Sequence, residues 1–484
     1  MNVIQSVDLS VMAPVVIVAV AALLALLVDL FLAQGPRWPG LIALLGLLTA
    51  AVWLPAARQA GSTLCIPHAW CAYDVNRITV VLQGLVIAGS VLVVLMSLVV
   101  VDDLGLPGGE YYFLLLSSVA GAVALPATRD LVSLIVVLEV VTLPTIALVA
   151  LRRDRRAAPA ALQMFLFSIV SLAVSLYGLA LVYGSSGRVD LGSLWAFTHE
   201  PAHHSVTLGV GIVLILAVAL FKVAAVPFNA WAPDTYAGAP IPVAGYLSVV
   251  SKLAGFAALI LITVTFSGWW PLWSGVLAVV AALTMLVGNL GALRQHSAVR
   301  LLAWSSIAQA GYVLVPLAAL VGGPAGSAGM LSAMVAYLAV YLAMNLGAFA
   351  VVALVSREAP SARLDDFTGL AWQHPVEGVC LAFFLACLAG LPPGLAGLFV
   401  KVRVLAEPAS SGAWWLAVVM GVATVIGLAY YLAWAARLFR RADGVHVSIR
   451  RGGAWGTVAA AGLAMVAAVV FSVAPSLALG LLPG

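Results

Sequence analysis

The sequence predicts an all-α membrane protein with about fourteen transmembrane helices. Of its 484 residues, 64% are hydrophobic and only 8% are charged, whereas a soluble domain carries about 25% charged residues. A water-soluble fold has too little interior to bury so much apolar surface. The apolar runs recur along the whole chain and are continuous rather than alternating, which indicates helices rather than the strands of a barrel.

Fourteen apolar segments are expected to form these helices. In chain order they are 12–33, 39–56, 78–101, 111–127, 131–151, 158–183, 206–227, 241–265, 271–293, 300–321, 328–355, 376–406, 412–436 and 454–479. The loops between them are short and rich in glycine, proline and charged residues. Because nothing in the sequence has the composition of a soluble domain, we interpret 1–484 as a single polytopic membrane domain.

The positions of the arginines predict that both termini lie outside the cytoplasm, because Lys and Arg accumulate in short cytoplasmic loops. With the N-terminus outside, the inner loops hold Arg37, Arg152, Arg153, Arg155, Arg156, Arg294, Arg300, Arg357, Arg363, Arg437, Arg440, Arg441, Arg450 and Arg451, and the outer loops hold only Arg58, Arg77, Arg129 and Arg188. An even number of helices then returns the C-terminus to the outside. This orientation also places Cys65 and Cys71 where a disulfide between them can form.

The seventh and twelfth predicted helices are each interrupted by proline close to a lysine. Lys222 precedes Pro227, and Lys401 follows Pro392 and Pro393. Two independent proline kinks would explain each break alone, but not the lysine that both share. Paired broken helices in corresponding positions instead indicate an ion path between structural repeats.

The five-helix spacing of the breaks predicts two inverted five-helix repeats, formed by helices 4–8 and 9–13. The corresponding divisions of the chain are 1–105 for the first three helices, 106–268 for the first repeat, 269–440 for the second repeat and 441–484 for the last helix.

Lysine occurs only at Lys222, Lys252 and Lys401, and all three lie within apolar predicted helices. Arginine stays protonated at any accessible pH, whereas a lysine withdrawn from water can release its proton near neutrality. An ionisable group near the bilayer centre costs at least ~2.5 kcal/mol, so such groups usually serve a function. The three lysines therefore predict a subunit that translocates protons. For Lys401, which is followed by Arg403, the alternative is a side chain that extends to the membrane surface.

Glu139 is the carboxylate that we expect deepest in the membrane, midway along 131–151. It is the natural partner of Lys222, and a change in their separation would let the lysine alternate between holding and releasing a proton. The alternative is a static ion pair that fixes helix packing. Further polar candidates for a water chain, which can equally be packing residues, are Tyr337, Tyr341, Asn345, Thr424, Tyr430 and Tyr431.

The sequence lacks the usual patterns for a cofactor. All seven histidines fall in predicted loops or at helix ends, and there is no Cys-x-x-Cys motif or phosphate-binding glycine loop. We therefore expect no metal, redox centre or other cofactor in this chain.

Three segments resemble the antiporter-like membrane subunits of proton-pumping NADH:quinone oxidoreductase, the respiratory complex I. They are 221–252, which contains Phe-Lys-Val-Ala-Ala-Val-Pro-Phe and ends in Ser-Lys, 300–312, which reads Arg-Leu-Leu-Ala-Trp-Ser-Ser-Ile-Ala-Gln-Ala-Gly-Tyr, and 388–393, which reads Leu-Ala-Gly-Leu-Pro-Pro. The resemblance covers roughly residues 100 to 440. Among the three related subunit types, the lysine on the twelfth helix and the short segment after the last helix favour type N.

The resemblance implies that Glu139 and Lys222 form the entry pair of a hydrated axis that Lys252 and Lys401 continue. It implies a multi-pass subunit of a bacterial cell membrane that pumps protons, with quinone reduction and NADH binding located in other subunits. Its expected partners are other membrane subunits, lipid, protons and internal water, without nucleic acid. Asn229 and Gln309 stand where many relatives have histidine, so an imidazole relay does not carry over, although both amides can hold water.

Two other functions remain open at this point. Subunits of multicomponent Na⁺/H⁺ antiporters share several of these signatures and have no redox partners. A structural membrane-arm subunit that does not pump is the third possibility, but it would gain nothing from four buried ionisable groups.

Overall fold

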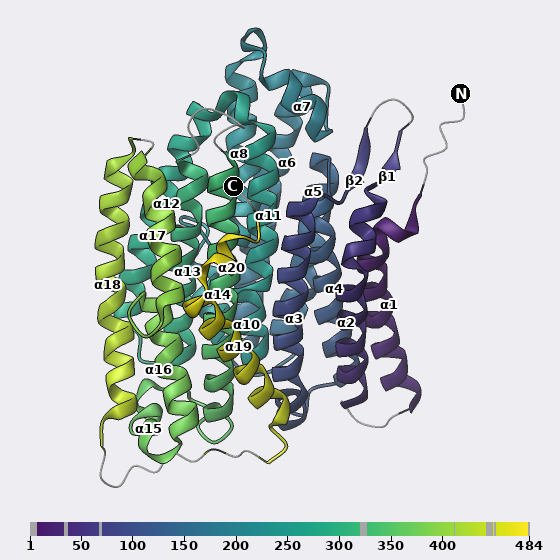
Figure 1. Ribbon diagram of the computed structural model, residues 1–484. Coiled ribbons are helices and arrows are strands. Elements are labelled where there is room, and N and C mark those ends of the chain that lie inside the picture. The colour runs from purple at the N-terminus through teal and green to yellow at the C-terminus, as the bar shows by residue number, and fades with distance from the viewer. Residues whose placement is uncertain are drawn as a thin grey trace.

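The protein is a bundle of long helices that run side by side (Figure 1). The computed structural model describes residues 7–32, 37–66, 70–319, 327–410, 412–441, 449 and 452–482. Within these ranges, twelve helical spans are long and apolar enough to cross a membrane. The protein is therefore an all-α, multi-pass membrane protein, as predicted.

The helices differ in length and in where they begin. Their bounds are α1 Leu9–Leu32, α2 Arg37–Ala60, α3 Arg77–Asp103, α4 Gly108–Ala124, α5 Leu131–Ala150, α6 Ala157–Ser186, α7 Leu191–Thr198, α8 Val206–Lys222, α9 Trp231–Gly238, α10 Ile241–Ser248, α11 Val250–Thr265, α12 Trp270–Leu293, α13 Ala298–Ala318, α14 Ser327–Ser356, α15 Leu370–Gln373, α16 Pro375–Ala389, α17 Leu395–Ser410, α18 Trp414–Phe439, α19 Trp455–Val473 and α20 Pro475–Leu479. Several helices start at a side chain that accepts a hydrogen bond from the first turn, such as Asn76 before α3 and Asp130 before α5.

Helices α13 and α14 form the centre of the bundle. Their membrane-spanning parts are almost wholly buried, as are α10 and α11, whereas only about a third of the residues of α1, α6 and α18 are buried. The large exposed side chains of α6 and α18 are aliphatic or aromatic, which suits helices that face lipid. The central helices therefore carry the residues that lie farthest from lipid.

Both predicted helix breaks are present. Helix α8 ends at Lys222, and Ala224 then adopts a left-handed φ of 56°. Helix α16 ends at Ala389, where Gly390 has a φ of 82°, and α17 begins at Leu395. Each broken helix is thus shorter than the continuous span predicted for it. The total of fourteen membrane crossings and the inverted repeat stay predictions.

The predicted span 241–265 is present as the apolar span Ile241–Thr265, but it is interrupted at one residue. The structure divides it at Val249, whose φ of −123° and ψ of −66° lie outside the helical region, into α10 and α11. Asn345 of α14 donates a hydrogen bond of 2.8 Å to the Ser248 hydroxyl beside this break. No proline or glycine occupies the break, so the local sequence gave no sign of it.

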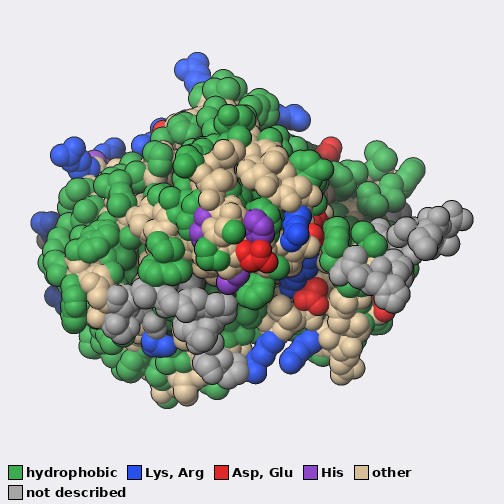
Figure 2. All heavy atoms as spheres, turned by 90° about the horizontal axis from the view of Figure 1, so that it is seen from above, with side chains coloured by type: hydrophobic (Ala, Val, Ile, Leu, Met, Phe, Trp, Pro, Cys, Tyr) green, Lys and Arg blue, Asp and Glu red, His purple; other side chains and the backbone are tan. Residues whose placement is uncertain are grey.

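A small hairpin lies outside the membrane helices. Strands β1 Ser62–Cys65 and β2 Cys71–Asp74 pair antiparallel, and a disulfide joins Cys65 to Cys71, a pairing that the sequence allowed but left open. The hairpin and α7 lie at one end of the bundle, and α15 lies at the other (Figure 1). Figure 2, which looks onto the end with α7, shows a small group of histidines beside charged side chains in a largely hydrophobic surface.

Candidate functional site

Lys222 lies at the last position of α8 and is only 1% exposed. Its Nζ donates a hydrogen bond of 2.9 Å to the Thr142 hydroxyl on α5. Glu139 lies one turn earlier on α5 and interacts electrostatically with the lysine, but the two groups form no ion pair within 4.0 Å in the described structure. The expected partners are therefore brought together, with Thr142 making the direct contact.

Lys252 lies near the start of α11 and is also 1% exposed. Its Nζ donates to the backbone oxygen of Ser306 at 2.6 Å and to the hydroxyl of the same residue at 3.1 Å. Gly255, one turn along α11, packs so closely on α8 that a Cβ there would lie 3.0 Å from the Lys222 Cβ. Helix α11 therefore carries Lys252 and also contacts Lys222 of α8.

Lys401 lies in the second turn of α17, and its side chain reaches back to the break that precedes this helix. Its Nζ donates to the carbonyl oxygens of Leu388 and Ala389 at 2.7 and 3.0 Å, and lies 5.2 Å from the centre of the Tyr312 ring. A helix that ends leaves its last carbonyls without intrahelical donors, and the ammonium satisfies two of them. The lysine therefore points inward and does not extend to the membrane surface.

Helix α13 connects the Lys252 contact to the Lys401 contact. Ser306 accepts the hydrogen bonds of Lys252, and Gln309, one turn later, donates from Nε2 to the Leu388 oxygen at 3.3 Å. The Gln309 amide also bonds to Tyr337 and Tyr431. Ser306 is not among the residues predicted from the sequence. Its spacing from Gln309, one turn apart on an apolar helix, could have indicated it.

Buried polar groups without a protein partner lie on the helices that carry or face these lysines. Among the described residues they include Glu139 Oε1, Tyr236 OH, Ser251 Oγ, Tyr341 OH and Asn345 Oδ1. Such groups are usually satisfied by internal water. The candidates on α18 differ, because Tyr430 bonds to Asn289 at 2.9 Å and Tyr431 bonds to Ser305. Asn229 is buried in the segment that follows α8.

The three ammonium groups share one chemical feature: every hydrogen bond described for them goes to a neutral oxygen. A Thr or Ser hydroxyl can accept from a protonated lysine and donate to a neutral one. The hydroxyls beside Lys222 and Lys252 therefore suit either protonation state of the amine, whereas the carbonyls beside Lys401 can only accept. Within the described residues, no cluster of three or more His, Cys, Asp or Glu side chains is placed to hold a metal ion.

Comparison with known proteins identifies the family. Residues 128–427 match the sequence model described as the transmembrane domain of NADH:quinone oxidoreductase and Mrp antiporters. The chain belongs to this family. It is 48% identical to NADH-quinone oxidoreductase subunit N 2 of Streptomyces griseus, over 92% of this chain and 85% of that protein. This agrees with the predicted resemblance to type N.

Solved structures give the same fold. The chain superposes on a chain of respiratory complex I from Thermus thermophilus with a TM-score of 0.78 and 30% identity, covering 96% of this chain and 98% of the other. A chain of the Mrp complex from Dietzia, with a TM-score of 0.82 and 21% identity over 97% and 96% of the two chains, shares the fold.

Proposed function

We propose that this family member translocates protons in the membrane arm of an NADH:quinone oxidoreductase, through Glu139, Lys222, Lys252 and Lys401. Its activity is coupled to quinone reduction in other subunits, and this chain itself holds no redox centre. The observation that supports the proposal best is the set of three buried lysines bonded to neutral oxygens. A lysine in such a place can act as a proton carrier because no carboxylate forms an ion pair with it within 4.0 Å in the described structure.

The contact of Lys222 argues against a purely static role. A structural ion pair would place the ammonium directly on the Glu139 carboxylate, because a buried charge is stabilised mainly by its partner. Instead the ammonium lies on Thr142, and Glu139 Oε1 has no hydrogen-bond partner in the described structure. We infer that Lys222 alternates between Thr142 and Glu139 as protons arrive and leave.

The remaining steps follow the contacts between helices. From Lys222 the proton reaches Lys252 on α11, whose neighbour Gly255 touches Lys222. Helix α13 then links Lys252, through Ser306 and Gln309, to the carbonyls that hold Lys401. Water between the unpaired hydroxyl and amide groups completes the path.

We propose the following setting for this activity, and the relatives support its membrane location and its membrane-subunit partners. The chain works in a bacterial cell membrane, with other membrane subunits of the complex as partners and both termini outside. Lipid covers the exposed apolar faces, and NADH binds elsewhere in the complex.

The test replaces Lys222 by arginine and, separately, by methionine. Arginine keeps the charge but does not release its proton, so Lys222→Arg is expected to assemble and to lose most proton pumping and NADH oxidation in sealed vesicles. Assembly is measured as the amount of intact complex. If Lys222→Arg pumps at the wild-type rate, the lysine has a structural role and the proposal is wrong.

The same vesicles separate this function from Na⁺/H⁺ exchange. We expect NADH to drive proton uptake equally in sodium-free and sodium-containing buffer. Sodium efflux that requires a proton gradient and is independent of NADH would instead assign the chain to the antiporter class.

A further inference from the structure

A large cavity opens at the end of the bundle where the predicted inner loops meet. Its volume is about 970 Å³, at the upper end of the ~300–1,000 Å³ typical of ligand sites. The segment between α5 and α6, helix α9, the start of α13 and the segment after α14 all contribute to its lining. None of these segments carries the buried lysines, although Tyr236 of α9 both lines the cavity and is one of the unpaired polar groups described above.

The cavity has an excess of positive charge. It is lined by the arginines Arg152, Arg155, Arg156, Arg300, Arg357 and Arg363 and by the acidic residues Asp103 and Asp234. Both carboxylates are already paired, Asp234 with Arg300 and Asp103 with Arg357, each at 2.6 Å. The guanidinium groups of Arg155, Arg156 and Arg363 have no carboxylate within 4.0 Å in the described part of the chain.

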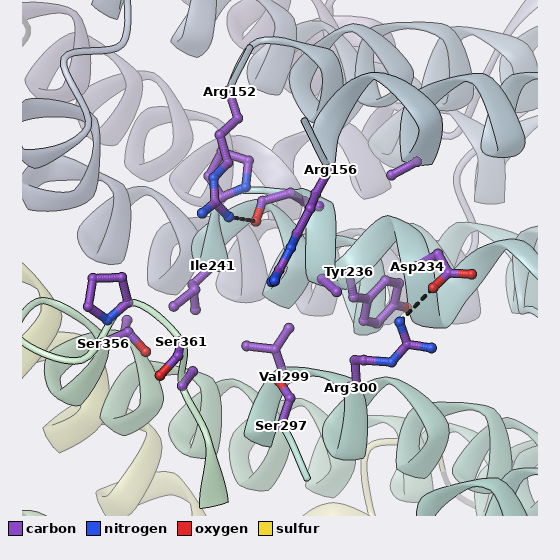
Figure 3. Close-up of a pocket in the computed structure, with 18 of the residues that line it drawn as sticks. Arg152, Arg156, Asp234, Tyr236, Ile241, Ser297, Val299, Arg300, Ser356 and Ser361 are labelled. Atoms are coloured by element: carbon purple, nitrogen blue, oxygen red, sulfur yellow. Dashed lines mark hydrogen bonds and ion pairs between the residues drawn. The ribbon is translucent and has the colours of Figure 1, made fainter. Parts of the chain in front are cut away.

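The arginines are arranged around the hollow. Figure 3 shows Arg152 and Arg156 entering from the segment between α5 and α6, with the Arg156 guanidinium reaching toward the centre of the space. Arg152 is held in place by Asp154 at 2.8 Å and by the Ala239 oxygen at 3.4 Å. Ser356 and Ser361 lie on the opposite side. Guanidinium groups placed in this way suit the oxygens of a phosphate.

One edge of the cavity continues into an apolar stripe on α6. Pro159 and Gln163 line the cavity, and Leu166 and Val170 follow at helical spacing on the same face. Leu166 is 54% exposed and Val170 is 57% exposed. A phosphate and an apolar chain of the same molecule can thus be accommodated together, with the chain running along α6 into the membrane.

We propose that this cavity binds the headgroup of an anionic phospholipid, with its phosphate among Arg155, Arg156 and Arg363 and an acyl chain on Leu166 and Val170. Basic pockets between membrane helices at the cytoplasmic side are suited to such headgroups. The site does not depend on the proposed proton path, because none of the three arginines that would bind the phosphate belongs to that path.

The test measures phosphatidylglycerol bound to the full chain in its purified membrane assembly, by native mass spectrometry after exchange into defined lipid. The variant Arg156→Gln with Arg363→Gln is expected to bind phosphatidylglycerol about a hundredfold more weakly, or roughly tenfold for each charged hydrogen bond. The control is Arg294→Gln with Arg440→Gln, which removes the same charge from predicted inner loops outside the cavity. This control is expected to bind like the wild type.

A third variant identifies the source of the phosphate. Leu166→Gln is expected to weaken phosphatidylglycerol binding and to leave phosphatidylcholine binding unchanged. If inorganic phosphate binds in an arginine-dependent manner while Leu166→Gln binds phosphatidylglycerol normally, the ligand is a soluble phosphate and the lipid proposal is wrong. The lipid proposal would also be wrong if the two double variants bound phosphatidylglycerol equally well. It would be wrong, too, if another subunit filled the cavity in the assembled complex.

Discussion

Thr142 makes the only direct hydrogen bond described for the Lys222 ammonium. Thr142→Val keeps the shape of the side chain and removes this acceptor, which leaves a buried charge without its partner at a cost of about 1–3 kcal/mol. We therefore expect proton pumping and NADH oxidation to fall about tenfold in sealed vesicles, while the complex still assembles.

Thr142→Ser is the matched control, because it keeps the hydroxyl and removes only a methyl group. It is expected to retain most of the activity. If valine and serine at this position behave alike, the hydroxyl does not take part in proton transfer.

At the scale of single residues, the sequence predicts the charged groups but not the atoms to which they bond. Lys222, Lys252 and Lys401 stand out because every other basic residue apart from histidine is arginine. Their acceptors are a hydroxyl on α5, Ser306 on α13 and carbonyls at the end of α16. These contacts join segments more than ten residues apart, and periodicity within one segment carries no information on which helices meet.

At the scale of the helices, Gly255 allows α11 to approach α8 closely. A Cβ at this position would lie 2.8 Å from the Val223 Cγ1 and 3.0 Å from the Lys222 Cβ. Gly255→Val is therefore expected to destabilise the protein by about 1–3 kcal/mol through overpacking and to displace Lys222. The measurements are the midpoint of thermal unfolding in detergent and the pumping rate.

The control for this prediction is Gly275→Val on α12, where no atom lies within 4 Å of an added Cβ. It introduces the same β-branched residue into a helix and is expected to leave pumping unchanged. Equal effects of the two variants would mean that helix propensity, rather than the contact with α8, explains the result.

Helix breaks show which structural features a sequence can reveal. The breaks after Lys222 and Ala389 were predictable because proline cannot continue a helix. The break at Val249 was not, since valine residues surround it and its backbone is fixed within the folded bundle, where Asn345 contacts Ser248. The short helices α7 and α9 were also absent from the prediction, because neither is long enough to produce a membrane-spanning apolar run.

For the whole molecule, composition alone predicts the membrane class, because 64% hydrophobic residues leave no soluble alternative. Composition does not reveal which helices lie in the centre. An 18-residue stretch of α14 is wholly buried and less than a third of the corresponding stretch of α6 is buried, although the mean hydropathies of the two are nearly the same. Lipid and protein interior are both apolar, so hydrophobicity does not distinguish a face that meets lipid from one that meets another helix.

Two features support the predicted orientation of the bundle. The arginine-lined cavity lies at the end that we predict to be cytoplasmic, and the disulfide-bonded hairpin lies at the other end, near α7. Positive loops stay in the cytoplasm, and disulfides persist in oxidising compartments. Both features therefore favour the orientation with the α7 end outside, which stays a prediction.

Single cysteines at the two ends test this orientation. Glu200 follows α7 and Glu358 follows α14, and both are exposed. A membrane-impermeant maleimide is expected to label Glu200→Cys in spheroplasts and Glu358→Cys only in inside-out vesicles, with the unsubstituted chain as the control for Cys380 and Cys387. The reversed pattern would place the arginine cavity outside and the hairpin in the reducing cytoplasm.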